Sequence, residues 1–324
     1  MILDRRWRVG SVGRSNRAHG HKSGDGGAAP GAMPGTAARM GLAALIGIAT
    51  WIAVPVGANP GDVPEPAADE DEPRIAWRFG SIRHQVPLLE VFTSQECNSC
   101  PPVEQFLNGL AGRGYGPDKV VVLTWHVSYW PHLGWTDRFA LPASAERHAM
   151  FNEELVLSGP YTPQVMLNGR ERRERGNDLL AAIDGLGQRP PAARLRMLVE
   201  MPARSRNVLE IYGEFDRSTV NQKEIEVAQV IVAVFEMGLT TKVEAGENRG
   251  RTLREDYVVR RLASAHEVRV IDHILHLGTQ VGVEPGWNVD RLGVAAFVQV
   301  KRDRKIYQAT AGLLDPKTAR PADP

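Results

Sequence analysis

The stretch Leu89-Glu-Val-Phe-Thr-Ser-Gln-Glu-Cys-Asn-Ser-Cys-Pro-Pro102 contains both cysteines of this 324-residue chain. Cys97 and Cys100 are separated by two residues, follow a short apolar run and precede a segment that can form a helix. A cysteine pair with this spacing, placed between a strand and a helix, is typical of a redox-active dithiol. The stretch therefore predicts thiol–disulfide exchange and leaves the substrate open.

The N-terminal part of the chain predicts export. Residues 1–58 consist of a basic extension and then an uncharged apolar run, residues 41–58, that ends in small residues. This order is typical of a secretory signal peptide that is cleaved after Ala58. Because a run of this length can also just cross a bilayer, the alternative is a membrane anchor that leaves the rest of the chain outside the cytoplasm. We expect a periplasmic or secreted protein.

Residues 59–79 are rich in proline and acidic side chains, and we expect them to form a solvated linker. The net charge of +1 gives no basic surface for a nucleic acid, so no nucleic-acid partner is expected. A membrane would be contacted only through residues 41–58, and only if they are retained. No cofactor is predicted, and the sequence leaves the oligomeric state open.

Because disulfides persist outside the cytoplasm, an exported chain is expected to form a disulfide between Cys97 and Cys100. The pair is then either a structural disulfide or a working redox couple. A disulfide that closes so short a loop constrains the unfolded chain little, which favours the redox couple.

Two folded parts are expected after the linker. Residues 80–190 alternate between strand and helix patterns, and Asn168-Gly169 predicts a hairpin because both residues tolerate positive φ. Beyond Pro190-Pro191, residues 192–315 contain several strand patterns separated by turns, which predicts a β-rich, sandwich-like domain. One helix is expected there, at 254–263, and residues 316–324 are expected to form a tail.

The strand, the CxxC pair at a helix start, and a later strand preceded by Thr162-Pro163 together resemble the thioredoxin fold. The resemblance implies that Pro163 is the cis-proline that faces the disulfide across the sheet. Further segments resemble a family of bacterial secreted, thioredoxin-like proteins known only as a domain of unknown function: Glu90–Pro102, His126–Trp130, Leu133–Trp135, Tyr161–Gln164, Asn168–Arg170, Gly246–Leu253 and Tyr257–Arg260. The chain is therefore expected to be an α/β protein with a thioredoxin-like domain at 80–190.

In this hypothesis the Cys97 thiolate attacks a disulfide, and Cys100 resolves the mixed disulfide. The resemblance implies that Glu90, an acid within an apolar run, transfers the proton of the resolving cysteine. The alternative is a carboxylate satisfied by the backbone or by an arginine. Glu96, directly before Cys97, is expected to raise the pKa of the Cys97 thiol through its negative charge.

Aromatic and polar residues near the pair are candidates for substrate binding. Tyr161, Thr162 and Trp130 are expected to line a groove for a peptide or ligand, although such aromatics also pack insertions against their own domain. His126 ends a buried strand, where it could stabilise the Cys97 thiolate, bind a metal together with both cysteines, or be a packed histidine.

The sequence therefore predicts an exported thiol–disulfide oxidoreductase whose partner is a thiol or disulfide, small or protein-bound. One alternative is a protein that binds or carries copper or another metal through Cys97, Cys100 and His126. A further alternative is a non-catalytic binding module with a structural disulfide.

Overall fold

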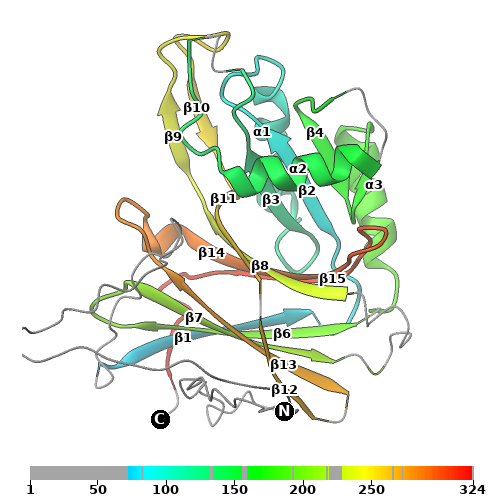
Figure 1. The fold of residues 1–324 in the computed structure, drawn as a ribbon, viewed down its shortest axis with the longest axis vertical. Helices are drawn as coiled ribbons and strands as arrows, with labels where there is room; N and C mark the ends of the chain where they lie inside the picture. Colours follow the sequence, from blue (N-terminus) through cyan, green and yellow to red (C-terminus); the bar gives the residue numbers. More distant parts are fainter. Residues whose placement is uncertain are drawn as a thin grey trace, which may run out of the picture. The chain divides into compact units, whose positions relative to one another are not determined.

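Two large β-sheets, a two-stranded hairpin and three α-helices make up the part of the chain that the structure describes (Figure 1). The structure is a computed structural model. It describes residues 72–81, 83–130, 134–154, 159–191, 193–216, 218, 228–264, 266–271 and 273–322. The predicted signal or anchor segment and residues 59–71 of the predicted linker lie outside the described residues. Within that part of the chain, no helix is long and apolar enough to span a membrane.

The first sheet has six strands, and all of its neighbouring strands are antiparallel. Apolar side chains alternate along its central strands and point to one face, as expected for a half-buried sheet. In spatial order the strands are β12 (His266–Ile271), β13 (Ile274–Gly282), β7 (Val208–Asp216), β6 (Arg194–Pro202), β1 (Arg74–Ser81) and β16 (Arg320–Pro321).

The second sheet has eight strands and mixes parallel with antiparallel pairs. β3 is parallel to both of its neighbours, and the other pairs are antiparallel. In spatial order the strands are β15 (Ile306–Leu313), β14 (Leu292–Val300), β8 (Ala228–Glu236), β11 (Val258–Ser264), β3 (Val121–His126), β2 (Leu88–Thr93), β4 (Gln164–Leu167) and β5 (Arg170–Glu171). β2 and β3 are buried along their whole length, as their continuous apolar runs predict.

The helices cover the end of this sheet that carries β2 to β4 (Figure 1). α1 (Pro101–Asn108) and α3 (Gly176–Gly187) pack on one face, where Leu107 and Ile183 join Leu89 and Val91 of β2. α2 (Pro142–Glu154) places Phe151 in a second cluster on the other face. A separate hairpin, β9 (Leu239–Lys242) and β10 (Thr252–Glu255), lies next to α1.

A large apolar core lies between the two sheets. It joins side chains of β1, β6 and β7 with side chains of β8, β14 and β15. The eight-stranded sheet also takes strands from both predicted parts, 80–190 and 192–315. The described chain is thus mixed α/β and mostly β-strand, with its two sheets packed face to face.

Some of the predictions made for single segments of the chain agree with this structure, and others do not. The helix predicted at 254–263 is wrong: these residues form β10 and β11, because the buried Val258 and Val259 pair with β3 and β8. The end of the predicted linker overlaps β1, since Trp77 is buried in the core between the sheets. The Thr162–Pro163 peptide bond is cis, as predicted.

Candidate active site

Cys97 and Cys100 form a disulfide in the segment that connects β2 to α1. Cys97 is 8% exposed, whereas Cys100 is completely buried, so Cys97 is the less buried of the two. The Cys97 Sγ atom lies 3.5 Å from the backbone carbonyl oxygen of Thr162 and 3.2 Å from Ser99 Oγ. The structure thus brings the cysteine pair together with the predicted Thr162 and the cis peptide bond that follows it.

The helix α1, which follows the disulfide in the chain, carries a buried carboxyl, that of Glu104. Cys100 caps α1 and already has helical dihedral angles, and the Glu104 N–H donates to the Cys100 carbonyl at 3.2 Å. Side chains one helical turn apart are neighbours on the same face of a helix. Burial raises the pKa of the Glu104 carboxyl to about 7, against the lowering effects of the His126 charge and of a hydrogen bond from Thr93.

His126 lies on the α1 side of the eight-stranded sheet, where its register partner is Thr93. Its Nδ1 atom is 2.7 Å from Asp137 Oδ2, and its Nε2 atom has no partner among the described residues. Burial alone would lower the pKa of His126, but the carboxylates of Asp137, Glu255 and Glu104 raise it to about 9. The imidazole is therefore cationic at neutral pH.

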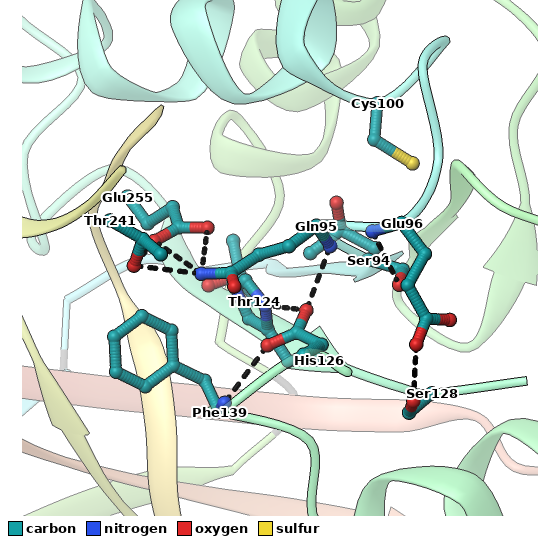
Figure 2. Close-up of polar contacts among 12 residues, drawn as sticks. Ser94, Gln95, Glu96, Cys100, Thr124, His126, Ser128, Phe139, Thr241 and Glu255 are labelled. Carbon is teal, nitrogen blue, oxygen red and sulfur yellow. Dashed lines mark hydrogen bonds and ion pairs between the residues drawn. The ribbon is translucent and has the colours of Figure 1, made fainter. Parts of the chain in front are cut away.

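Gln95 connects this cluster to the hairpin β9–β10 (Figure 2). Its side-chain amide donates to Thr241 Oγ1 and to Glu255 Oε1, both at 2.9 Å, and its backbone N–H donates to Asp137 at 2.8 Å. Burial raises the pKa of Glu255. Three acids from three segments, Glu104, Asp137 and Glu255, thus surround one buried imidazole.

Glu96 points away from solvent. It is completely buried and accepts hydrogen bonds from Ser128 Oγ and from the backbone N–H of Trp130, the latter at 3.0 Å. Figure 2 shows the Glu96 side chain directed toward Ser128. Trp130, predicted to contact substrate, is partly buried, and its ring packs edge-on against Tyr129.

Glu90 is paired with an arginine, which was the alternative to a role in proton transfer. It lies on the sheet face opposite α1, because its neighbours Leu88 and Phe92 belong to the cluster that contains Phe151 of α2. Arg147 donates to both carboxylate oxygens of the buried Glu90. This geometry fits a structural ion pair, whereas Glu104 is a buried carboxyl on the α1 side of the sheet, four residues after Cys100.

Tyr161 lies at the surface, where the residue is 37% exposed, and its hydroxyl donates to Glu171. Thr162 Oγ1 has no hydrogen-bond partner among the described residues. The next residue but one, Gln164, is held by His148, whose Nε2 atom is 2.8 Å from Gln164 Oε1. Of the predicted substrate-binding residues, Thr162 therefore lies beside Cys97, and Tyr161 precedes it at the surface.

No three His, Cys, Asp or Glu side chains are grouped as metal ligands anywhere in the described part of the chain. The alternative ligand set of Cys97, Cys100 and His126 is therefore not assembled. His126 is instead bound to Asp137.

Comparisons with known proteins agree with this description at the level of the family. A family model described as "Protein of unknown function (DUF1223)" matches residues 88–299, more than half of the chain. The chain belongs to this family. The expected membership of a family without an assigned function is thereby confirmed. No match was found among the curated proteins.

Two solved structures are similar to the chain. Protein AGR_C_4864 from Agrobacterium tumefaciens is 25% identical over 72% of this chain and 97% of that chain, with a TM-score of 0.49. HBP35 of Porphyromonas gingivalis is 14% identical over 75% of this chain and 81% of that chain, with a TM-score of 0.53. The likeness to HBP35 extends to the fold alone.

Sequence reasoning missed Glu104, Asp137 and Glu255. Glu104 had a usable signal, since it follows Cys100 by four residues in a predicted helix and precedes the apolar pair Phe106-Leu107. Asp137 and Glu255 had none, because they reach the site from a long connection and from a distant hairpin.

Proposed function

We propose that this protein is an exported thiol–disulfide oxidoreductase that exchanges the Cys97–Cys100 pair with thiols or disulfides of small molecules or proteins. One observation carries the proposal: Cys97 is 8% exposed and lies beside Thr162, while Cys100 is completely buried. Nucleophilic attack by or on an outside sulfur requires access to one cysteine only, and the second must wait within reach. An inert disulfide would need no such division.

A thioredoxin-like fold of residues 80–190 is part of this proposal. It is supported by the chain order of β2, the CxxC pair, α1 and the parallel β3, followed by α2, a cis-proline and the antiparallel β4–β5 hairpin. Export to the periplasm or the exterior is supported by residues 1–58, a basic extension followed by an apolar run that ends in small residues.

The proposed exchange runs in two steps. In the dithiol form, the Cys97 thiolate attacks a disulfide RSSR′, which forms the mixed disulfide Cys97–SR and releases R′S⁻. The Cys100 sulfur then attacks the Cys97 sulfur and releases RS⁻, so the protein regains its disulfide. Two electrons pass from the protein to the substrate, and the reverse sequence oxidises a dithiol substrate.

The second step requires the buried Cys100 thiol to lose its proton. Burial disfavours a thiolate, so a nearby base is needed. The Glu104 carboxylate, one helical turn from Cys100, fits this task, because its pKa of about 7 lets it both accept and return a proton at neutral pH. The proton leaves Cys100 for Glu104 and then passes to the departing thiolate, so none is lost or gained overall.

The test is a redox titration of the full-length chain in mixtures of reduced and oxidised glutathione, followed by alkylation of free thiols. We expect a reversible two-electron transition, and turnover of oxidised glutathione with dithiothreitol as the electron donor. Cys97→Ser should abolish the turnover, because the sulfur that attacks the substrate is lost. A native disulfide that resists dithiothreitol, or a reducible one without turnover, would instead assign a structural role to the pair.

A further inference from the structure

The loop of the β9–β10 hairpin is hydrogen-bonded to the CxxC segment. The side-chain amide of Asn248 donates to the carbonyl oxygens of Gln95 and Cys97, both at 2.9 Å. The backbone N–H of Asn98 donates to Glu247 at 3.2 Å. The segment that carries Cys97 is thus held by residues about 150 positions later in the chain.

The orientation of the Asn248 amide is fixed on its other side. Arg251 donates to Asn248 Oδ1 at 2.8 Å, so the nitrogen must face the two carbonyls. Asn248 is completely buried, although its sequence neighbours Glu247 and Arg249 are exposed. The loop folds back on itself through a bond from the Gly250 N–H to the Val243 carbonyl, and Gly250 has a φ of 82°. A single buried side chain therefore connects the hairpin to the carbonyls on both sides of Glu96.

We infer that Asn248 is a positioning residue that sets the stability of the Cys97–Cys100 disulfide relative to the dithiol. This inference rests on the proposed function in that the pair is taken to open and close. Cys100 is fixed by the first turn of α1, whereas Cys97 precedes the helix, and its carbonyl accepts from the Cys100 N–H at 3.3 Å and, more closely, from Asn248 at 2.9 Å. By holding the Cys97 carbonyl, Asn248 keeps the two Cα atoms at the 5.5 Å separation that a disulfide accepts.

The physical consequence is a change in a redox equilibrium. Holding two thiols in a geometry that permits bonding raises their effective concentration and favours the disulfide. Because the same hydrogen bonds hold Cys97 near Cys100 in the dithiol, less conformational freedom is lost when the two sulfurs join. The hairpin of the C-terminal half therefore belongs to the redox site.

The test compares Asn248→Ala with wild type in the glutathione equilibrium of the full-length chain. Two neutral hydrogen bonds are lost, each with a modest net contribution, so the equilibrium constant is expected to shift about tenfold toward the dithiol. For a two-electron couple this corresponds to a rise in reduction potential of about 30 mV. Asn248→Ser, which retains one donor, should give an intermediate shift and serves if the alanine variant fails to fold.

Asn108→Ala is the matched control. The Asn108 side chain donates to the Arg254 carbonyl at 2.9 Å and so joins α1 to the same hairpin, but it makes no hydrogen bond to the CxxC segment. The reduction potential of the Asn108→Ala variant should equal that of wild type. In urea unfolding, Asn248→Ala should destabilise the oxidised protein more than the reduced protein, a difference that a purely structural role would not produce.

The outcomes separate this inference from the proposed function. Glutathione equilibration needs no turnover, so a tenfold shift in Asn248→Ala supports the inference even if the wild type proves catalytically inactive. A wild-type couple with an unchanged equilibrium constant in Asn248→Ala and Asn248→Ser overturns the inference and leaves the proposed function intact. An equal shift in Asn108→Ala would also overturn it, since the effect would then belong to the hairpin as a whole.

Discussion

Replacement of Glu104 by glutamine should change how the stability of the oxidised protein depends on pH. Burial raises the Glu104 pKa from 4.5 to about 7, so between these values the native state holds a proton that the unfolded chain has released. The stability of the native state therefore falls as pH rises through this window, by about 1.4 kcal/mol per pH unit. From about pH 5 to pH 6.5 the loss attributable to Glu104 is about 2 kcal/mol.

Glutamine lacks this titration and can still accept the hydrogen bond from Thr93. His126 contributes little to the comparison, because its raised pKa of about 9 keeps it protonated in the native state, and its unfolded form, with a pKa of about 6.5, titrates alike in both proteins. The free energy of unfolding in urea, measured from pH 5 to 6.5, should therefore fall by about 2 kcal/mol less in Glu104→Gln than in wild type. The exposed Glu244 provides the control, since Glu244→Gln should follow the wild-type curve. Parallel curves for wild type and Glu104→Gln would refute the assigned pKa and with it the role of Glu104 as a base.

Three other outcomes follow from the described contacts. Arg147→Met should lower the free energy of unfolding by about 3–5 kcal/mol, because it leaves the Glu90 carboxylate buried and unpaired, and a loss below about 1 kcal/mol would contradict the buried pair. Asp137→Asn should lower the His126 pKa in an NMR titration, since Asp137 is the main group that raises it; an unchanged pKa speaks against the coupling. Tyr161→Ala should raise the KM for a disulfide substrate a few-fold and leave stability within about 0.5 kcal/mol, whereas an unaltered KM would remove Tyr161 from the substrate surface.

The sequence was informative wherever the signal was local. The spacing of Cys97 and Cys100, the apolar run before them and the turn residues Asn168-Gly169 each depend on neighbours in the chain, and the structure has a disulfide, a buried strand and a hairpin at these places. The helix predicted at 254–263 was wrong because a weak local pattern was overridden by pairing with β3 and β8.

The sequence was silent wherever a partner is distant. Asn248 lies 153 residues from Gln95, and nothing around it in the chain indicates that its amide is buried beneath the cysteines. Glu90 could be recognised as a buried acid, but its partner Arg147 lies 57 residues away on α2. A buried carboxyl next to an arginine and one next to a thiol have the same sequence pattern, so only the fold separates Glu90 from Glu104.

The proposed roles of the two sulfurs, attack on the substrate by Cys97 and resolution by Cys100, can be tested directly by trapping a mixed disulfide. Each single Cys→Ser variant is incubated with oxidised glutathione under native conditions, and the adduct is quantified by intact-protein mass spectrometry. Cys100→Ser should accumulate a stable adduct at Cys97, while Cys97→Ser should remain nearly unmodified, because Cys100 is sealed. Equal modification of both variants, or none in either, would contradict the account.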